Sequence, residues 1–147
     1  MSNACRRLRP CWFELKQQIA DHVRAAGFEV VDLGTTDTAS VDWPDYGAAI
    51  GRYVAAGDAD RGIAVCGSGI GICIAANKVD GVRAATVHDV TSARLSRQHN
   101  DANIICLGER FTGIQVAIDA VNAFLSTEFE GGRHQRRIDK VTALEAE

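Results

Sequence analysis

The sequence predicts an α/β fold: a three-layer α/β/α, Rossmann-like, doubly wound parallel sheet of about five strands. Short apolar runs rich in β-branched residues alternate with segments of helical periodicity along the chain. The run Val82–Val87 lacks polar alternation, as expected for a strand covered on both faces. Since parallel strand–helix–strand connections are right-handed, helices are expected on both faces of the sheet.

The first expected helix covers Phe13–Ala26, where apolar residues recur on one face and Gly27 is suited to end it. Phe28–Leu33 is rich in valine and is followed by Gly34, so it is expected to be a strand. A doubly wound sheet also needs a strand ahead of the first helix, and this requirement brings the expected count to about five.

The next helix is expected to begin at Asp42 or Trp43, because Pro44 suits the first turn of a helix. It runs to about Ala56, and Arg61–Cys66 is the strand that follows.

A glycine-rich loop and a helix ending at Asn77 come next, before the strand Val82–Val87. The remaining expected elements are a helix capped by Asp89 and ending at Gln98, a strand over Asn103–Leu107, a helix over Ile114–Leu125 capped by Thr112, and a final helix with Ile138, Val141 and Leu144 on one face.

The composition is that of an ordinary globular protein. The chain has 147 residues, 46% of them hydrophobic and 24% charged, so we expect residues 1–147 to form a single domain. A net charge of −3 gives no reason to expect nucleic acid or a membrane surface as a partner. Five cysteines without metal-type spacing favour reduced thiols and a cytoplasmic location.

The loop Cys66-Gly67-Ser68-Gly69-Ile70-Gly71 is the best candidate for a reaction centre. It follows a buried strand, and open α/β sheets bind ligands at the carboxyl ends of their strands. Its glycines let the backbone approach a ligand, and the N–H groups that open the next helix favour an anion or a developing oxyanion. Tight packing is the alternative explanation for the glycines, and a small buried hydrophobe is the alternative for Cys66.

Two further groups could contribute to a site. His99 and Asn100 fall at a helix end, where an imidazole can act as acid or base near pH 7 and Asn100 can either cap the helix or donate to a ligand. Arg133 and Arg137 are four residues apart on one helix face, a spacing that suits one phosphate, and Arg110 is a third candidate. A solvated basic face is the alternative for the arginines.

Taken together, several separated motifs resemble the ribose-5-phosphate isomerase B family, which also holds galactose-6-phosphate isomerase subunits. The matching pieces are Phe13-Glu14-Leu15-Lys16, Asp42-Trp43-Pro44-Asp45-Tyr46, Cys66-Gly67-Ser68-Gly69-Ile70-Gly71, Ala75-Ala76-Asn77-Lys78, Ser96-Arg97-Gln98-His99-Asn100-Asp101 and Gly131-Gly132-Arg133-His134. They span residues 13 to about 138.

The resemblance implies an aldose–ketose isomerase that works through an enediolate without a metal or cofactor, as in the pentose phosphate pathway. Cys66 would be the base, since a helix N-terminus favours a thiolate. Ser68 and the backbone of Gly67, Gly69, Ile70 and Gly71 would hold the enediolate oxygen, and His99 would open the furanose ring.

The resemblance also implies how substrate and partner are bound. Asn100 would position sugar hydroxyls, while Arg110, Arg133 and Arg137 would hold the phosphate. The site would be shared across a homodimer or a dimer of dimers, with the C-terminal helix packed on the partner subunit. Ribose 5-phosphate is the expected substrate. The alternatives are a six-carbon sugar phosphate, such as galactose or allose 6-phosphate, and a weakly active or inactive sugar-phosphate-binding paralogue.

The N-terminal segment departs from the family pattern. Family members carry a strand ending in Ser-Asp-His-Ala-Gly before the first helix, whereas this chain has Leu8-Arg9-Pro10-Cys11-Trp12. A suitable set of codons for Cys5–Trp12, read one base later, encodes Ala-Ala-Val-Ser-Asp-His-Ala-Gly. Residues 4–12 are therefore hypothesised to be a frameshifted form of that strand, and activity is expected to be low if they stand as written.

Overall fold

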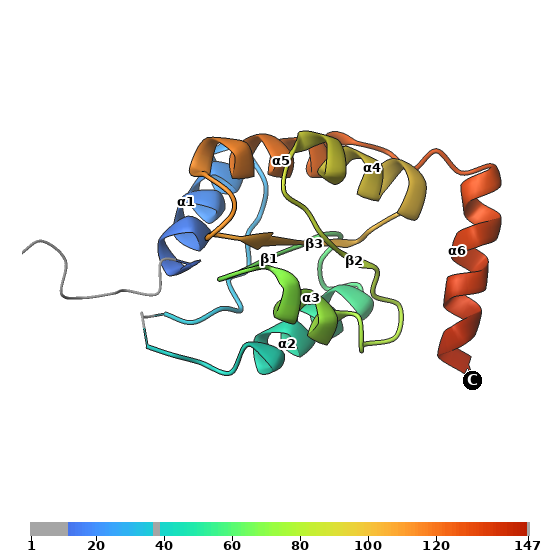
Figure 1. The fold of residues 1–147 in the computed structure, drawn as a ribbon, viewed down its shortest axis with the longest axis horizontal. Helices are drawn as coiled ribbons and strands as arrows, with labels where there is room; N and C mark the ends of the chain where they lie inside the picture. The colour runs from blue at the N-terminus through green and yellow to red at the C-terminus, as the bar shows by residue number, and fades with distance from the viewer. Residues whose placement is uncertain (1–11, 37–38, 147) are drawn as a thin grey trace, which may run out of the picture.

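The computed structural model describes residues 12–36 and 39–146 (Figure 1). In chain order its elements are α1 (Trp12–Ala25), α2 (Trp43–Ala55), β1 (Gly62–Cys66), α3 (Ile70–Ala76), β2 (Ala84–Thr86), α4 (Val90–Asn100), β3 (Ile104–Gly108), α5 (Ile114–Ser126), α6 (Arg133–Ala143) and a 3₁₀ turn (Leu144–Ala146). None of the described helices is long and apolar enough to cross a bilayer.

The strands form one parallel sheet in the order β1-β3-β2. Ile104 at the start of β3 is level with Gly62 of β1 and with Ala84 of β2, so the three strands begin at the same edge. The carboxyl ends of the strands therefore lie together at the opposite edge. The predicted parallel α/β sheet is confirmed.

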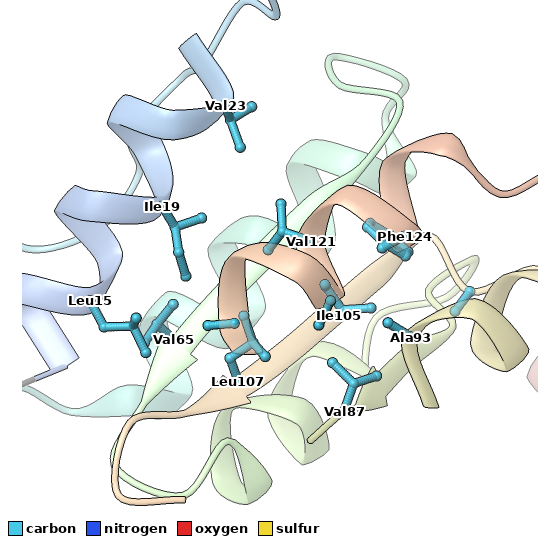
Figure 2. Packing of buried hydrophobic residues seen from close by; sticks show 13 residues of the cluster. Leu15, Ile19, Val23, Val65, Val87, Ala93, Ile105, Leu107, Val121 and Phe124 are labelled. Atoms are coloured by element: carbon cyan, nitrogen blue, oxygen red, sulfur yellow. The ribbon is translucent and has the colours of Figure 1, made fainter. Parts of the chain in front are cut away.

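Helices cover both faces of this sheet. Successive side chains of β3 point to opposite faces, and both sets are apolar, so each face needs a covering layer. Ile105 and Leu107 face α1, α4 and α5, and they pack in a core that includes Phe124 and Val121 (Figure 2). The residues at the centre of this layer are fully buried. They hold the three helices α1, α4 and α5 and the sheet as one packed unit.

The opposite face of β3 carries Ile104 and Cys106, which pack against α2 and α3. Gly47 of α2 lies against α3, where an added Cβ would come within 2.7 Å of the Cβ of Ala75. Glycine at this position lets the two helices pack closely, and α3 is the helix that follows the candidate loop. The three-layer arrangement is thus confirmed.

Four of the roughly five expected strands fall within the described residues, and the structure has three of them, because the strand expected over Phe28–Leu33 is absent. Phe28–Leu33 has no regular secondary structure, and Phe28 and Val31 are 50% and 52% exposed. A strand exists only where a neighbour takes up its backbone hydrogen bonds, and none of the described residues does so here. The strand expected over residues 4–12 lies outside the described residues, apart from Trp12, which begins α1.

The helix ends are mostly as expected. Gly27 follows α1 with φ +94°, and the side chains of Asp89 and Ser92 form a reciprocal capping box at the start of α4. The expected cap Thr112 is wrong: Gly113 is the residue before α5. The hydroxyl of Thr112 is instead buried, with no hydrogen-bond partner among the described residues.

The C-terminal helix α6 lies beyond the β2 side of the sheet, where its start meets the end of α4 and its remainder projects away from the sheet (Figure 1). Ile138 is buried, but Val141 and Leu144 of the same apolar face are 49% and 64% exposed. The helix therefore presents an apolar surface outward from the sheet and its covering helices.

Candidate active site

Cys66 is the last residue of β1, at the carboxyl edge of the sheet, and its side chain is half-buried. The backbone N–H of Gly69 donates to its Sγ at 3.1 Å. A hydrogen bond to sulfur stabilises negative charge there, and charge on sulfur is what a cysteine needs in order to accept a proton from a substrate carbon.

Gly69 is required for this contact. Its φ is +77°, and a Cβ at this position would lie 3.0 Å from the backbone nitrogen of Gly108. A side chain would therefore be both conformationally strained and in collision with the end of β3. The glycine brings the loop backbone close enough to β3 for its N–H to reach Cys66.

The Ser68 hydroxyl lies beside the start of α3. Its Oγ accepts a hydrogen bond from the backbone N–H of Ile70 at 3.2 Å. Because Oγ is the acceptor in this bond, the hydroxyl hydrogen can be donated to a ligand oxygen. Ser68 can thus act as an oxyanion donor next to Cys66.

A cavity of about 540 Å³ opens in front of this loop. Trp43 forms part of its wall and packs on Gly71, where an added Cβ would lie 3.0 Å from the indole ring. The guanidinium of Arg110 lies over Gly67, and the backbone N–H of Arg110 donates to the Gly67 carbonyl at 3.1 Å. The walls of the cavity thus include the thiol of Cys66, the hydroxyl of Ser68 and the cationic side chain of Arg110.

Two more thiols lie behind the loop without lining this cavity. Cys73 of α3 and Cys106 of β3 are both buried. A hydrogen bond from Cys106 lowers the pKa of Cys73 to about 6, and the same contact together with burial raises the pKa of Cys106. Among the described cysteines, Cys66 is the one that a substrate in the cavity would meet.

A second group of predicted residues gathers around His99, near the end of α4. The rings of His99 and His134 stack with centroids 4.4 Å apart and planes 6° from parallel. A carboxylate oxygen of Glu130 lies 4.0 Å from Nε2 of His99 and 3.6 Å from Nε2 of His134. Burial and the positive charge of a protonated His99 lower the pKa of His134.

Three ligand-type atoms of this cluster, one each from His99, Glu130 and His134, lie within 4.8 Å of one another. That spacing would suit a metal ion as well as a proton-sharing cluster. Parallel stacked imidazoles direct their nitrogen lone pairs along parallel lines, so the two rings do not converge on one ion. We therefore interpret the cluster as a stacked histidine pair beside a carboxylate rather than as a metal site.

Asn100, Arg133 and Arg137 lie on the same side of the molecule as His99. Asn100 is the exposed last residue of α4, and Asp101 rather than Asn100 is the cap, with φ +45°. The backbone N–H of Glu130 donates to the Gln98 carbonyl at 3.1 Å, which fixes the start of the arginine segment beside α4. Both arginines are exposed in the first turns of α6.

A single copy of the chain does not bring the two groups together. Three residues after Asn100, the Asn103 carbonyl accepts a hydrogen bond from the Gly62 N–H, at the amino end of β1. Cys66 ends the same strand, about 13 Å further along it. His99 and Asn100 therefore lie toward the amino edge of the sheet, and the reactive loop lies at the carboxyl edge.

Sequence reasoning assigned no role to some residues of these two groups. Trp43 and Tyr46 line the cavity, and Glu130 and His134 contact His99. Both pairs lie in or next to motifs that carry the family resemblance. The available signal for each pair was therefore its position in or next to a motif that matches the family, although the motif gave these residues no role.

Comparison with known proteins gives a consistent result. A model of the ribose/galactose isomerase family matches residues 11–141. Ribose-5-phosphate isomerase B of Escherichia coli is 45% identical over 133 residues, which cover 90% of this chain and 89% of the relative.

Solved structures agree with this match. Ribose-5-phosphate isomerase B of Clostridium thermocellum aligns with a TM-score of 0.90 and 49% identity, covering 91% of this chain and 90% of the other. The enzyme of Mycoplasma genitalium, solved with bound ribulose-5-phosphate, aligns with a TM-score of 0.87 and 46% identity over 91% of this chain and 90% of the other.

A relative from the galactose branch is more distant. The galactose-6-phosphate isomerase subunit LacB of Clostridium acetobutylicum is 37% identical over 127 residues, covering 86% of this chain and 73% of that subunit. By the extent of the family match and by the identities to its members, this chain belongs to the ribose/galactose isomerase family.

Proposed function

We propose that this chain is an aldose–ketose isomerase that interconverts ribose 5-phosphate and ribulose 5-phosphate through an enediolate. The observation that carries the proposal is the Cys66 thiol, held at the rim of the cavity by the Gly69 N–H in a chain of this family. The relatives named for the ribose 5-phosphate reaction are more similar to this chain than the LacB subunit is, which favours the five-carbon substrate.

In the proposed reaction the Cys66 thiolate removes the proton from C2 of the open-chain aldose. The electron pair of that C–H bond forms the C1–C2 double bond, and the carbonyl oxygen becomes an enediolate oxygen. Ser68 and the loop N–H groups stabilise this oxygen. The proton of the C2 hydroxyl passes to the enediolate oxygen on C1, and the thiol returns its proton to carbon C1, so that C1 becomes a CH2OH group and C2 becomes the ketose carbonyl.

The remaining predicted residues act before and around that step. His99 transfers the proton that opens the furanose ring, because a free carbonyl must exist before enolisation. Asn100 hydrogen-bonds sugar hydroxyls, and Arg110, Arg133 and Arg137 hold the phosphate. Binding at the phosphate orients carbons C1 and C2 against Cys66.

These roles require two copies of the chain. Cys66 and His99 lie toward opposite edges of one sheet, so a cavity that contains both must take one from each copy. The exposed apolar residues Val141 of α6 and Leu144 of the 3₁₀ turn that follows it provide a surface for the partner. We infer a homodimer or a dimer of dimers, built from one domain per chain, since both described cores share one sheet.

The first test is the formation of ribulose 5-phosphate from ribose 5-phosphate by the purified protein in the presence of EDTA. Loss of a general base predicts that Cys66→Ala lowers turnover by about a hundredfold or more. Cys73→Ala is the matched control, because Cys73 lies behind the loop, and it should keep turnover within a few-fold of the parent value.

Other results of this assay would replace the proposal. Turnover of galactose 6-phosphate but not of ribose 5-phosphate by the parent protein would favour the six-carbon alternative. Binding of either phosphate without turnover would favour the inactive paralogue, which the absence of Asp and His at positions 9 and 10 suggests.

A further inference from the structure

Asp101, the residue that ends α4, has an unusual backbone conformation. Its φ is +45°, and it is the only residue other than glycine with a positive φ in the described part of the chain. This left-handed conformation is unfavourable for a residue with a Cβ, and glycine is the usual residue where a helix ends in this way. Asp101 directly follows His99 and Asn100, two of the predicted site residues. Because such a conformation persists only where the surroundings hold it, the contacts of Asp101 are informative.

Two arginines hold the Asp101 carboxylate. Its Oδ1 accepts a hydrogen bond from Nη1 of Arg97 at 2.7 Å, and its Oδ2 accepts one from Nη2 of Arg83 at 2.9 Å. Nε of Arg83 also donates to the backbone carbonyl of Asp101 at 3.0 Å. Arg97 belongs to α4 itself, whereas Arg83 directly precedes the edge strand β2. Arg83 therefore ties the end of α4 to the start of that strand.

The position of Arg83 is fixed in turn by Asn103. Oδ1 of Asn103 accepts from the backbone N–H of Arg83 at 2.8 Å, and Nδ2 of Asn103 donates to the Gly81 carbonyl at 2.8 Å. The Arg83 carbonyl accepts from the backbone N–H of Asn103 at 3.1 Å. Asn103 directly precedes β3, the central strand of the described sheet. The loop 81–83 is thus held against the sheet, and the Arg83 side chain extends from this fixed loop to α4.

The same loop also contacts the C-terminal turn. The backbone N–H of Gly81 donates at 2.8 Å to Oε1 of Glu145, which lies in the 3₁₀ turn after α6. At its other end, α6 meets α4 through the stacked rings of His134 and His99. The loop 81–83 therefore contacts the end of α4, which carries His99, and the far end of the segment that carries His134.

We propose that Arg83 and Asp101 are positioning residues for His99. Their contact fixes where α4 ends, and since His99 lies two residues before Asp101, it fixes the direction in which the imidazole points. Glycine would adopt the same backbone conformation without strain, but it would offer no carboxylate to the two arginines. Aspartate at this position is thus explained by the placement of the helix end and not by local backbone preference.

The effect of this contact on catalysis rests on the proposed function. His99 is proposed to transfer the proton that opens the furanose ring, and this step needs an imidazole nitrogen within hydrogen-bond distance of the sugar. A displacement of about 1 Å can slow such a step by about a hundredfold. Cys66 is held by a different loop, at the other edge of its own sheet. Loss of the contact between Arg83 and Asp101 should therefore impair ring opening and leave proton transfer at Cys66 largely intact.

Two variants break the contact in different ways. Arg83→Met removes the arginine from the loop and leaves Asp101 paired with Arg97. Asp101→Gly relieves the backbone strain and removes the carboxylate. A residue that served only to end the helix would be replaced by glycine without loss, so this variant separates the two roles of Asp101.

The first measurement is the position of His99 in the folded protein without substrate. The stacked ring of His134 shields the Cε1–H proton of His99, so the NMR resonance of this proton should lie upfield of that of an exposed histidine. In Arg83→Met and Asp101→Gly we expect the resonance to move downfield, toward the exposed position. The control is Asp21→Asn, which breaks an exposed ion pair within α1 and should leave the resonance unchanged.

Two assays then separate ring opening from proton transfer at carbon. Turnover of ribose 5-phosphate needs both steps. Exchange of a C1 proton of ribulose 5-phosphate with solvent deuterium needs Cys66 but no ring opening, because the phosphate on O5 prevents this ketose from closing a furanose ring. We expect Arg83→Met to lower kcat for ribose 5-phosphate by about tenfold or more, while exchange at saturating ribulose 5-phosphate stays within about threefold of the parent value. Asp21→Asn should change neither rate.

Three results would overturn the positioning role. These are an unchanged His99 resonance in the folded variants, full ribose 5-phosphate turnover in Asp101→Gly, and equal losses of turnover and exchange in Arg83→Met, which would indicate a purely structural effect. If Asp101→Gly fails to fold, Arg83→Met decides the matter. A parent protein that turns over no ribose 5-phosphate would contradict the proposed function, whereas a shifted His99 resonance in the variants would still support the positioning role.

Discussion

The imidazole rings of His99 and His134 are stacked, 4.4 Å apart and nearly parallel, and both lie within 4.0 Å of the Glu130 carboxylate. Two protonated rings so close would repel each other, so the cluster favours one positive charge beside one carboxylate. The pKa of His134 is lowered, first by burial and then by the charge of the neighbouring His99, the residue proposed to open the sugar ring.

The pH dependence of stability should report on this pair. The pKa of His134 is lowered from 6.5 mainly by burial and secondly by the charge of His99. The unfolded chain thus binds this proton more tightly than the folded chain does. The contribution of neutral His134 to the free energy of unfolding is therefore fully present above pH 6.5 and is lost as the pH falls below it. His134→Phe keeps the stacking without titrating. As the pH is lowered from 7 to 5, the melting temperature of this variant should therefore fall less than that of the parent protein. A difference in melting temperature between variant and parent that stays constant from pH 7 to pH 5 would contradict the destabilising effect assigned to protonation of His134.

The left-handed glycine of the loop should be irreplaceable. Gly69→Ala adds a Cβ at φ +77°, 3.0 Å from the nitrogen of Gly108. Gly27→Ala is the matched control, since its φ is +94° but no atom lies within 4 Å of the added Cβ. The control should cost about 1 kcal/mol of unfolding free energy, and Gly69→Ala at least about 1 kcal/mol more, with isomerase activity lost. If urea denaturation shows equal losses of unfolding free energy for the two variants, the added Cβ at position 69 does not collide with the end of β3.

Arg97 should fix the end of α4, where His99 lies. Its buried guanidinium donates to the carboxylate of Asp101 and the carbonyl of Ala102, both at 2.7 Å, and to the carbonyl of Thr127 at 3.2 Å. Lysine cannot reach all three acceptors, so Arg97→Lys should destabilise the protein by about 2–4 kcal/mol. The exposed Arg94→Lys on the same helix should change the unfolding free energy by less than about 0.5 kcal/mol.

The arginines of α6 should act on substrate binding more than on chemistry. Arg133→Ala removes a cation proposed to hold the phosphate, which predicts a rise in KM of about tenfold or more for ribose 5-phosphate. Arg136→Ala removes an equally exposed charge from the same helix and serves as the control. If both variants raise KM equally, the effect is one of net charge, and the assignment of Arg133 is wrong.

Much of the fold follows from local pattern. The strand before Cys66, the glycine loop and the capping box at Asp89 are encoded by residues close together in sequence, and all three lie where the sequence predicts. Phe28–Leu33 has the same local pattern but is not a strand, because a strand also needs a neighbour from elsewhere in the chain. The neighbour that the sequence argument expects would come from residues 4–12, whose written sequence suits that position poorly.

The candidate site was predictable as a set of residues but not as an arrangement. Motifs identify Cys66 and His99, and topology places them at opposite edges of one sheet. Only the hydrogen bonds of the folded chain reveal that separation. The role of His134 was also hidden, since its stacking on His99 depends on the orientation of α6 relative to α4.

Mixing two inactive variants, Cys66→Ala and His99→Asn, tests the central claim most directly. Each variant alone should have little ribose 5-phosphate isomerase activity. If every site takes Cys66 from one copy and His99 from the other, half of the randomly mixed dimers carry one intact site, and activity should return to about a quarter of the parent value. No recovery after verified subunit exchange would contradict the shared site and the account built on it.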